Sequence, residues 1–106
     1  MAFADNLKQL PPVAHLSALE LFDTQGALAG RIENKPGQAG SLAVYAALAV
    51  KYGRLNTAAA EEALVIYAEH TDDARQNPGK HPNIDRLLAV VSSGQGFEVR
   101  MVPQGL

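Results

Sequence analysis

The side chains that could do chemistry gather in one segment, from Tyr67 to Leu88, of a chain otherwise rich in alanine, leucine and valine. This segment contains two of the three histidines. Its candidate catalytic residues are Glu69, His70, Asp73, His81 and Asp85. A histidine oriented by a carboxylate can act as a general acid or base. The segment is therefore a candidate acid–base site, provided that its two ends converge in the fold.

Three of these residues, His70, Asp73 and His81, are also candidate metal ligands, because imidazole and carboxylate groups bind divalent cations. However, the sequence has no His-Glu-x-x-His pattern, and His81 is predicted to lie in a different element from His70. The simpler interpretation is structural. It consists of a solvated helix end, a turn at Asn77-Pro78-Gly79 and a histidine that braces the next helix.

Two other places are candidates for binding an anion. The glycine-containing loop from Lys35 to Ser41 precedes a predicted helix, so Gly40 and Ser41 would offer backbone N–H groups at its start. Lys80 lies just before the start of another predicted helix. The phosphate-loop pattern Gly-x-x-x-x-Gly-Lys-Ser/Thr is absent, and glycine and proline in this loop are also explained by the need to turn the chain.

Length and composition narrow the class of protein. The chain has 106 residues and is expected to form one domain. Its nine basic and eleven acidic residues are scattered and give a net charge of −2, which argues against a nucleic-acid partner. It has no cysteine, no apolar run long enough to span a membrane and no cofactor motif, and its first residues are not expected to form a signal peptide. We therefore expect a cytoplasmic protein with no membrane association and no cofactor.

Alternation of apolar and polar residues predicts a β-hairpin from His15–Phe22 and Ala27–Glu33, joined at Asp23-Thr24-Gln25-Gly26. The first strand alternates imperfectly, which indicates a bulge or burial on both faces. Phe97–Val102 is predicted to be a third strand, added to the hairpin.

Helical patterns fill the middle of the chain. One helix is expected at Ser41–Tyr52, a second from Asn56 or Thr57 to a point before Asn77, and a third from Pro82 to Gly94. The predicted class is α+β, in the order ββαααβ, with three helices packed on one face of a three-stranded antiparallel sheet. Residues 1–12 are expected to form an N-terminal arm, with a short helix, and residues 103–106 a loose tail.

The helix predicted at Ser41–Tyr52 is apolar on nearly all sides. Such a helix is either central in its domain or covered by a second subunit. If a second subunit covers it, the interface would use Val44, Ala47 and Val50.

Three stretches of the chain resemble a family of short bacterial proteins classified as a domain of unknown function. They are Tyr67–Arg75, Asn77–Asp85 and the run Gly40-Ser41-Leu42-x-Val44-Tyr45. The resemblance extends over essentially the whole chain and implies a bacterial cytosolic protein. It brings no activity, cofactor or catalytic residue with it.

Two functions remain open. The favoured one is a non-enzymatic protein that self-associates as a homodimer or binds a protein partner, because the central helix is so apolar and a three-stranded sheet has exposed edges. The alternative is a small-ligand or metal-assisted enzyme that uses the segment Glu69–Asp85. The sequence does not decide whether the protein is an enzyme.

Overall fold

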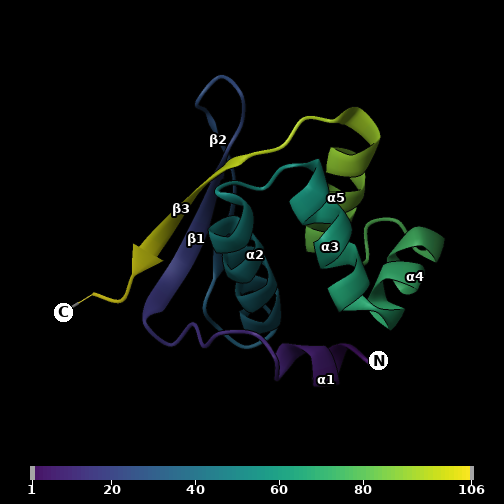
Figure 1. Ribbon diagram of the computed structural model, residues 1–106, viewed down its shortest axis with the longest axis horizontal. Helices are drawn as coiled ribbons and strands as arrows, with labels where there is room; N and C mark the ends of the chain where they lie inside the picture. Colours follow the sequence, from purple (N-terminus) through teal and green to yellow (C-terminus); the bar gives the residue numbers. More distant parts are fainter. Residues whose placement is uncertain (1, 106) are drawn as a thin grey trace.

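The computed structural model describes residues 2–105. A short helix precedes a hairpin, four helices follow, and a final strand completes the sheet (Figure 1). In chain order the elements are α1 (Phe3–Leu7), β1 (Leu16–Phe22), β2 (Leu28–Glu33), α2 (Ala39–Tyr52), α3 (Thr57–Tyr67), α4 (Glu69–Gln76), α5 (Pro82–Ser93) and β3 (Glu98–Pro103).

The three strands form an antiparallel sheet in the order β2-β1-β3, which confirms that the last strand adds to the hairpin. The turn is also as predicted, with Gly26 at a φ of 82° and the carboxylate of Asp23 accepting bonds from the N–H groups of Gln25 and Ala27. The register of β1 shifts between Leu21 and Phe22, so the imperfect alternation of this strand does reflect an irregular ladder.

The prediction of three helices packed on one face of the sheet was wrong in both helix number and packing. The described residues form five helices. Among them α2 packs along β1 and β2, whereas α3 packs on α2 and α5, and α4 packs on α3 and α5 (Figure 1). Three strands about 4.8 Å apart span roughly 10 Å, the width of one helix, so the sheet has room for little more than α2. The other long helices therefore form a further layer.

The predicted second helix is interrupted at Ala68, which separates α3 from α4. Ala68 has a φ of 52°, a conformation that residues with a Cβ atom rarely adopt. Carbonyl groups at the end of α3 find side-chain donors instead: the buried Thr71 hydroxyl donates to the carbonyl of Leu64 at 2.6 Å, and the amide of Asn6 donates to that of Ile66 at 2.9 Å. Side chains thus satisfy two of the carbonyl groups at the break, which lies just before His70.

The central position of α2 explains why its sequence is apolar on nearly all sides. One side faces the sheet and another faces α3. Val44 is buried within its own chain and Ala47 is half-buried, while Val50 is 78% exposed. Of the three predicted interface residues, Val50 is the most exposed, Ala47 is partly exposed and Val44 is not available to a partner.

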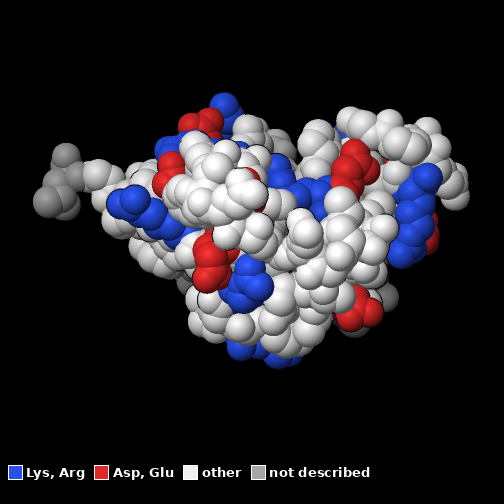
Figure 2. Space-filling model, turned by 90° about the horizontal axis from the view of Figure 1, so that it is seen from above, with Lys and Arg blue, Asp and Glu red and all other residues white. Residues whose placement is uncertain are grey.

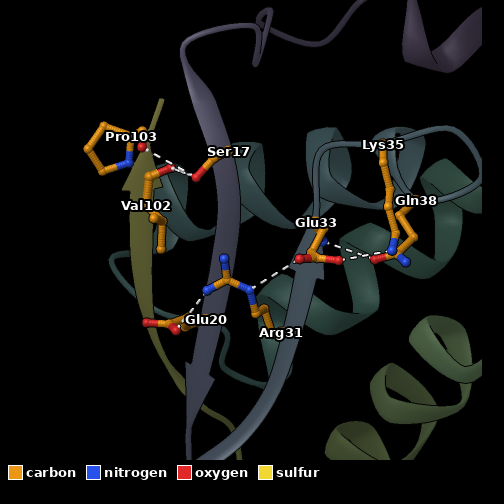
Figure 3. A network of polar contacts seen from close by, with 8 residues as sticks. All are labelled: Ser17, Glu20, Arg31, Glu33, Lys35, Gln38, Val102 and Pro103. Carbon is orange, nitrogen blue, oxygen red and sulfur yellow. Dashed lines mark hydrogen bonds and ion pairs between the residues drawn. The ribbon is translucent and has the colours of Figure 1, made fainter. Parts of the chain in front are cut away.

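Surface ion pairs lie on the outer face of the sheet. Arg31 bridges Glu20 on the neighbouring strand at 2.9 Å and Glu33 on its own strand at 3.7 Å, and Lys35 lies 3.0 Å from Glu33 (Figure 3). Acidic and basic side chains are also interspersed over the face of the molecule shown in Figure 2. This agrees with the scattered charges of the sequence.

The two chain ends contact the body of the domain. In the predicted arm, α1 contacts α3 and α2. In the predicted tail, Pro103 ends β3, and the backbone N–H of Gln104 donates to the carbonyl of His15 at 2.9 Å. The terminal residues Met1 and Leu106, which belong to these predicted segments, lie outside the described residues.

Candidate functional site

A cavity of about 380 Å³ opens where the first turns of α2 and α5 meet the break between α3 and α4. Gly40 and Ser41 line it from α2, and Lys80, His81 and Asn83 from the start of α5. Tyr67 and His70 line it from the two sides of the break, and Phe3 of α1 completes the wall. The cavity therefore brings together the two predicted anion-binding places and both histidines of the polar segment.

The carboxylate of Asp73 bonds to two of the lining residues, Lys80 and His81, and is not itself a lining residue. Its Oδ2 atom accepts from Nε2 of His81 at 2.6 Å and lies 2.9 Å from Nζ of Lys80. Its Oδ1 atom accepts from the amide of Asn77 at 2.9 Å. The hydrogen bonds from His81 and Lys80 lower the pKa of Asp73 to about 2, so this carboxylate is ionised at neutral pH. The predicted histidine–carboxylate pair is therefore present, formed by His81 and Asp73.

The other two candidate carboxylates, Glu69 and Asp85, are likewise not lining residues. Oε1 of Glu69 accepts from the backbone N–H of Phe3 at 2.9 Å, and this bond lowers the pKa of Glu69. Oδ2 of Asp85 accepts from the backbone N–H of Gly79 at 2.9 Å. Both side chains stabilise neighbouring segments. Glu69 bonds to the N-terminal helix, and Asp85 bonds to the turn before α5. None of the described lining residues is acidic.

The starts of α2 and α5 present hydrogen-bond donors to the cavity. Within the described residues, the backbone N–H groups of Gly40, Ser41 and Asn83 make no backbone hydrogen bond, as expected for the first turn of a helix. The two helix ends are held together by Tyr45, whose hydroxyl donates to the carbonyl of Asn83. Burial raises the pKa of Tyr45 to about 12, which keeps this donor protonated.

Aromatic rings form an unbroken run along the cavity. The Phe3 ring stacks on that of Tyr67 with centroids 5.0 Å apart, and it meets His70 edge-on at 5.2 Å. The rings of His70 and His81 lie 5.6 Å apart. Tyr67 also donates from its hydroxyl to Oγ of Ser41 at 2.7 Å, and burial raises the pKa of the tyrosine.

Sequence reasoning missed three residues of this site. Phe3 falls in the predicted N-terminal arm, while Tyr67 and Asn83 lie within the polar segment but have no predicted role there. Only the apolar spacing of Phe3, Leu7 and Leu10 indicated that the N-terminal segment docks at all. The same spacing could not show where it docks.

The histidines and carboxylates do not assemble into a multidentate metal site. Within residues 2–105, no group of three or more histidine, aspartate or glutamate side chains is arranged to hold a metal ion. His70 contacts His81 through its ring, while Asp73 is already engaged by His81 and Lys80. The same part of the chain also has no helix with the length and apolar character needed to span a bilayer.

The fold and the cavity define a small α+β domain in which a pocket is built at the starts of two helices. The chain belongs to the family described as "uncharacterized protein conserved in bacteria (DUF2322)", whose model matches residues 3–101. This confirms the family resemblance found in the sequence. Neither the curated proteins nor the solved structures that were searched gave a match.

Proposed function

We propose that this protein binds a small anionic ligand, a phosphate or a carboxylate, in the cavity between α2 and α5. The observation that carries the proposal is a cavity of about 380 Å³ lined by Lys80, His70 and His81, with no acidic residue among its described lining residues. Backbone N–H groups of Gly40, Ser41 and Asn83 and the positive ends of two helix dipoles support it. Cavities that hold small organic ligands begin at about 300 Å³.

The ligand-binding part of this proposal develops the alternative function predicted from the sequence, and it assigns no reaction. His81 has the geometry of a general base oriented by a carboxylate, because Asp73 fixes its Nε2 atom. A reaction would require a substrate whose reacting atoms lie near this ring. Binding is therefore the function to be tested first.

The test is a titration with inorganic phosphate followed by amide chemical shifts. We expect saturable shifts at Gly40, Ser41 and Asn83. Replacing Lys80 with glutamine should weaken binding about fivefold, the effect of removing one charge close to the ligand in a solvated site. Lys51→Gln is the matched control, because Lys51 lies at the opposite end of α2 and pairs with Glu62. Absence of saturable shifts, or equal weakening by both variants, would contradict the proposal.

Self-association is a second candidate function, favoured by an exposed apolar residue beside an apolar hollow. Val50 is 78% exposed and borders a hollow of about 210 Å³, which Pro12, Leu16, Ala47 and Met101 also line. A two-fold symmetric contact would place Val50 of each chain in the hollow of the other and bury both. Only Ala47 and Val50 of the predicted interface residues take part.

Sedimentation velocity tests self-association. We expect the native chain to be a dimer at high micromolar concentration and Val50→Asp to be monomeric. Val65→Asp is the matched control, because Val65 is 74% exposed on α3 and lies outside the hollow. A native chain that stays monomeric, or equal dissociation by both aspartate substitutions, would exclude this interface.

A further inference from the structure

The cavity has more room and more aromatic surface than a simple anion requires. Tyr67, Phe3, His70 and His81 all line it, and their rings follow one another at centroid separations of 5.0, 5.2 and 5.6 Å. Tyr67 is buried beneath Phe3, so the accessible rings are those of Phe3, His70 and His81. These rings come from α1, the end of α3, α4 and the residue before α5. An inorganic anion held by Lys80 and the helix starts would leave most of this wall uncovered.

Two hydrogen bonds of α1 and packing against the core fix the position of the Phe3 ring. The backbone N–H of Phe3 donates to Glu69, and Asn6 of the same helix donates to the carbonyl of Ile66. A Cβ atom on Gly40 would lie 3.6 Å from the Phe3 ring, an ordinary van der Waals distance, so α1 lies directly against the start of α2. No residue of α1 is buried. Phe3 and Leu7 are nevertheless packed against the core, so α1 both covers part of the core and places an aromatic side chain in the cavity wall.

We infer that the ligand carries a planar ring as well as its anionic group, and that Phe3 contributes to recognising that ring. The inference rests on the proposed anion binding and specifies the class of ligand: an aryl or nucleobase-bearing phosphate or carboxylate. The anionic group lies at Lys80 and the helix starts, and the ring packs against the aromatic wall. Contacts between a ligand ring and protein aromatic side chains favour binding through both apolar burial and stacking.

Calorimetric titration of the full chain with a matched series of compounds tests this inference. The series is inorganic phosphate, propyl phosphate, phenyl phosphate and adenosine monophosphate, with benzoate to separate carboxylate from phosphate. We expect phenyl phosphate, adenosine monophosphate or benzoate to bind about tenfold more tightly than propyl phosphate, the size of effect that one stacking contact produces. The ring compound that binds best then shows whether the ring of the ligand is an aryl group or a nucleobase, and whether its anionic group is a phosphate or a carboxylate.

Phe3→Leu keeps an apolar side chain and removes the ring. It should abolish the advantage of ring compounds over propyl phosphate and leave the affinity for inorganic phosphate unchanged. Phe22→Leu is the control, because Phe22 lies in β1 outside the cavity and its substitution should leave the advantage intact. Melting temperatures of both variants show whether they are folded.

The outcomes separate this inference from the proposed function. If inorganic phosphate binds but ring compounds gain nothing over propyl phosphate, the inference about the ring is overturned and anion binding stands. If Phe3→Leu, while folded, retains the full advantage, Phe3 has no part in recognition and the inference is likewise overturned. If no compound of the series binds, the proposed function fails and the inference fails with it.

Discussion

Nε2 of His81 lies 2.6 Å from Oδ2 of Asp73, and this contact joins the start of α5 to α4. The hydrogen bonds from His81 and Lys80 lower the pKa of Asp73 from 3.8 to about 2 in the folded chain. A group whose pKa is lower in the folded than in the unfolded state stabilises the fold above its unfolded pKa. The stabilisation by ionised Asp73 is therefore complete above about pH 4 and is lost as the pH falls towards 2.

Asp73→Asn should accordingly reduce the free energy of unfolding at pH 5, and the difference from the native chain should shrink steadily between pH 4 and pH 2. Urea denaturation at closely spaced pH values measures this difference. Asp72→Asn is a suitable control, since the neighbouring Asp72 is exposed and its ion pair is a longer one, 3.7 Å from Arg75. A difference that does not change with pH would show that the Asp73 contacts do not favour the ionised carboxylate.

Thr71→Val should destabilise the protein by about 1–3 kcal/mol, because it leaves the carbonyl of Leu64 without its buried donor. Thr71→Ser keeps the hydroxyl and should lose only about 1 kcal/mol, the value of one buried methyl group. Urea denaturation at neutral pH compares the two variants. Equal losses would show that the methyl group, and not the hydrogen bond, accounts for the effect.

Ala68→Gly should stabilise the protein by about 1 kcal/mol, because glycine adopts the φ of 52° without the steric cost that alanine meets. The matched change Ala89→Gly, at an exposed position in the middle of α5, should instead destabilise it by about 0.5–1 kcal/mol. Thermal and urea denaturation of both variants show whether each substitution raises or lowers the free energy of unfolding. A loss of stability at both positions would show that the backbone at Ala68 is not strained.

Gly96→Ala should be severely destabilising, by about 2 kcal/mol or more. A Cβ atom at this position would lie 2.1 Å from the carbonyl oxygen of Leu55, whose bridge to Phe97 ties the start of α3 to the chain before β3. Gly105→Ala is the control, because a Cβ atom there has no atom within 4 Å among the described residues. Similar stability of the two variants, measured by thermal denaturation, would contradict the close approach at Gly96.

Local sequence signals predicted the elements that depend on local chemistry. Asn56 does cap α3, with its side chain accepting from the N–H of Ala59 at 2.8 Å. Pro82 is the first residue of α5, and Gly53 and Gly94 end α2 and α5 at positive φ. These signals are strong because each residue type satisfies a backbone requirement at its own position.

The interruption at Ala68 was not predictable in this way. Alanine is the best helix former, so the sequence around it favours a continuous helix. What outweighs this preference is tertiary: Thr71 and Asn6 supply donors to the end of α3. The packing of α3 and α5 behind α2 likewise depends on the small area of the sheet. A local sequence pattern gives no information about that area.

The candidate site was predicted in separate pieces. Lys80, the pair Gly40 and Ser41, and the pair His70 and His81 were each considered, but for different chemistries. Their meeting at one cavity depends on the direction in which the chain leaves Ala68 and on the packing of α5 against α3. Glu69 and Asp85 have the same side-chain chemistry as Asp73 but bond to backbone N–H groups, a difference that residue type cannot reveal.

The place of β1 between β2 and β3 determines when the sheet can be completed during synthesis. β1 can pair with β2 as soon as the hairpin has been made, but its second edge waits for residues 98–103, beyond all five described helices. The bond from the Ser17 hydroxyl to the carbonyl of Val102 spans 85 residues (Figure 3). A nascent chain that stalls before β3 would expose an open strand edge beside apolar residues such as Leu19 and Leu21, the surface through which incomplete chains associate.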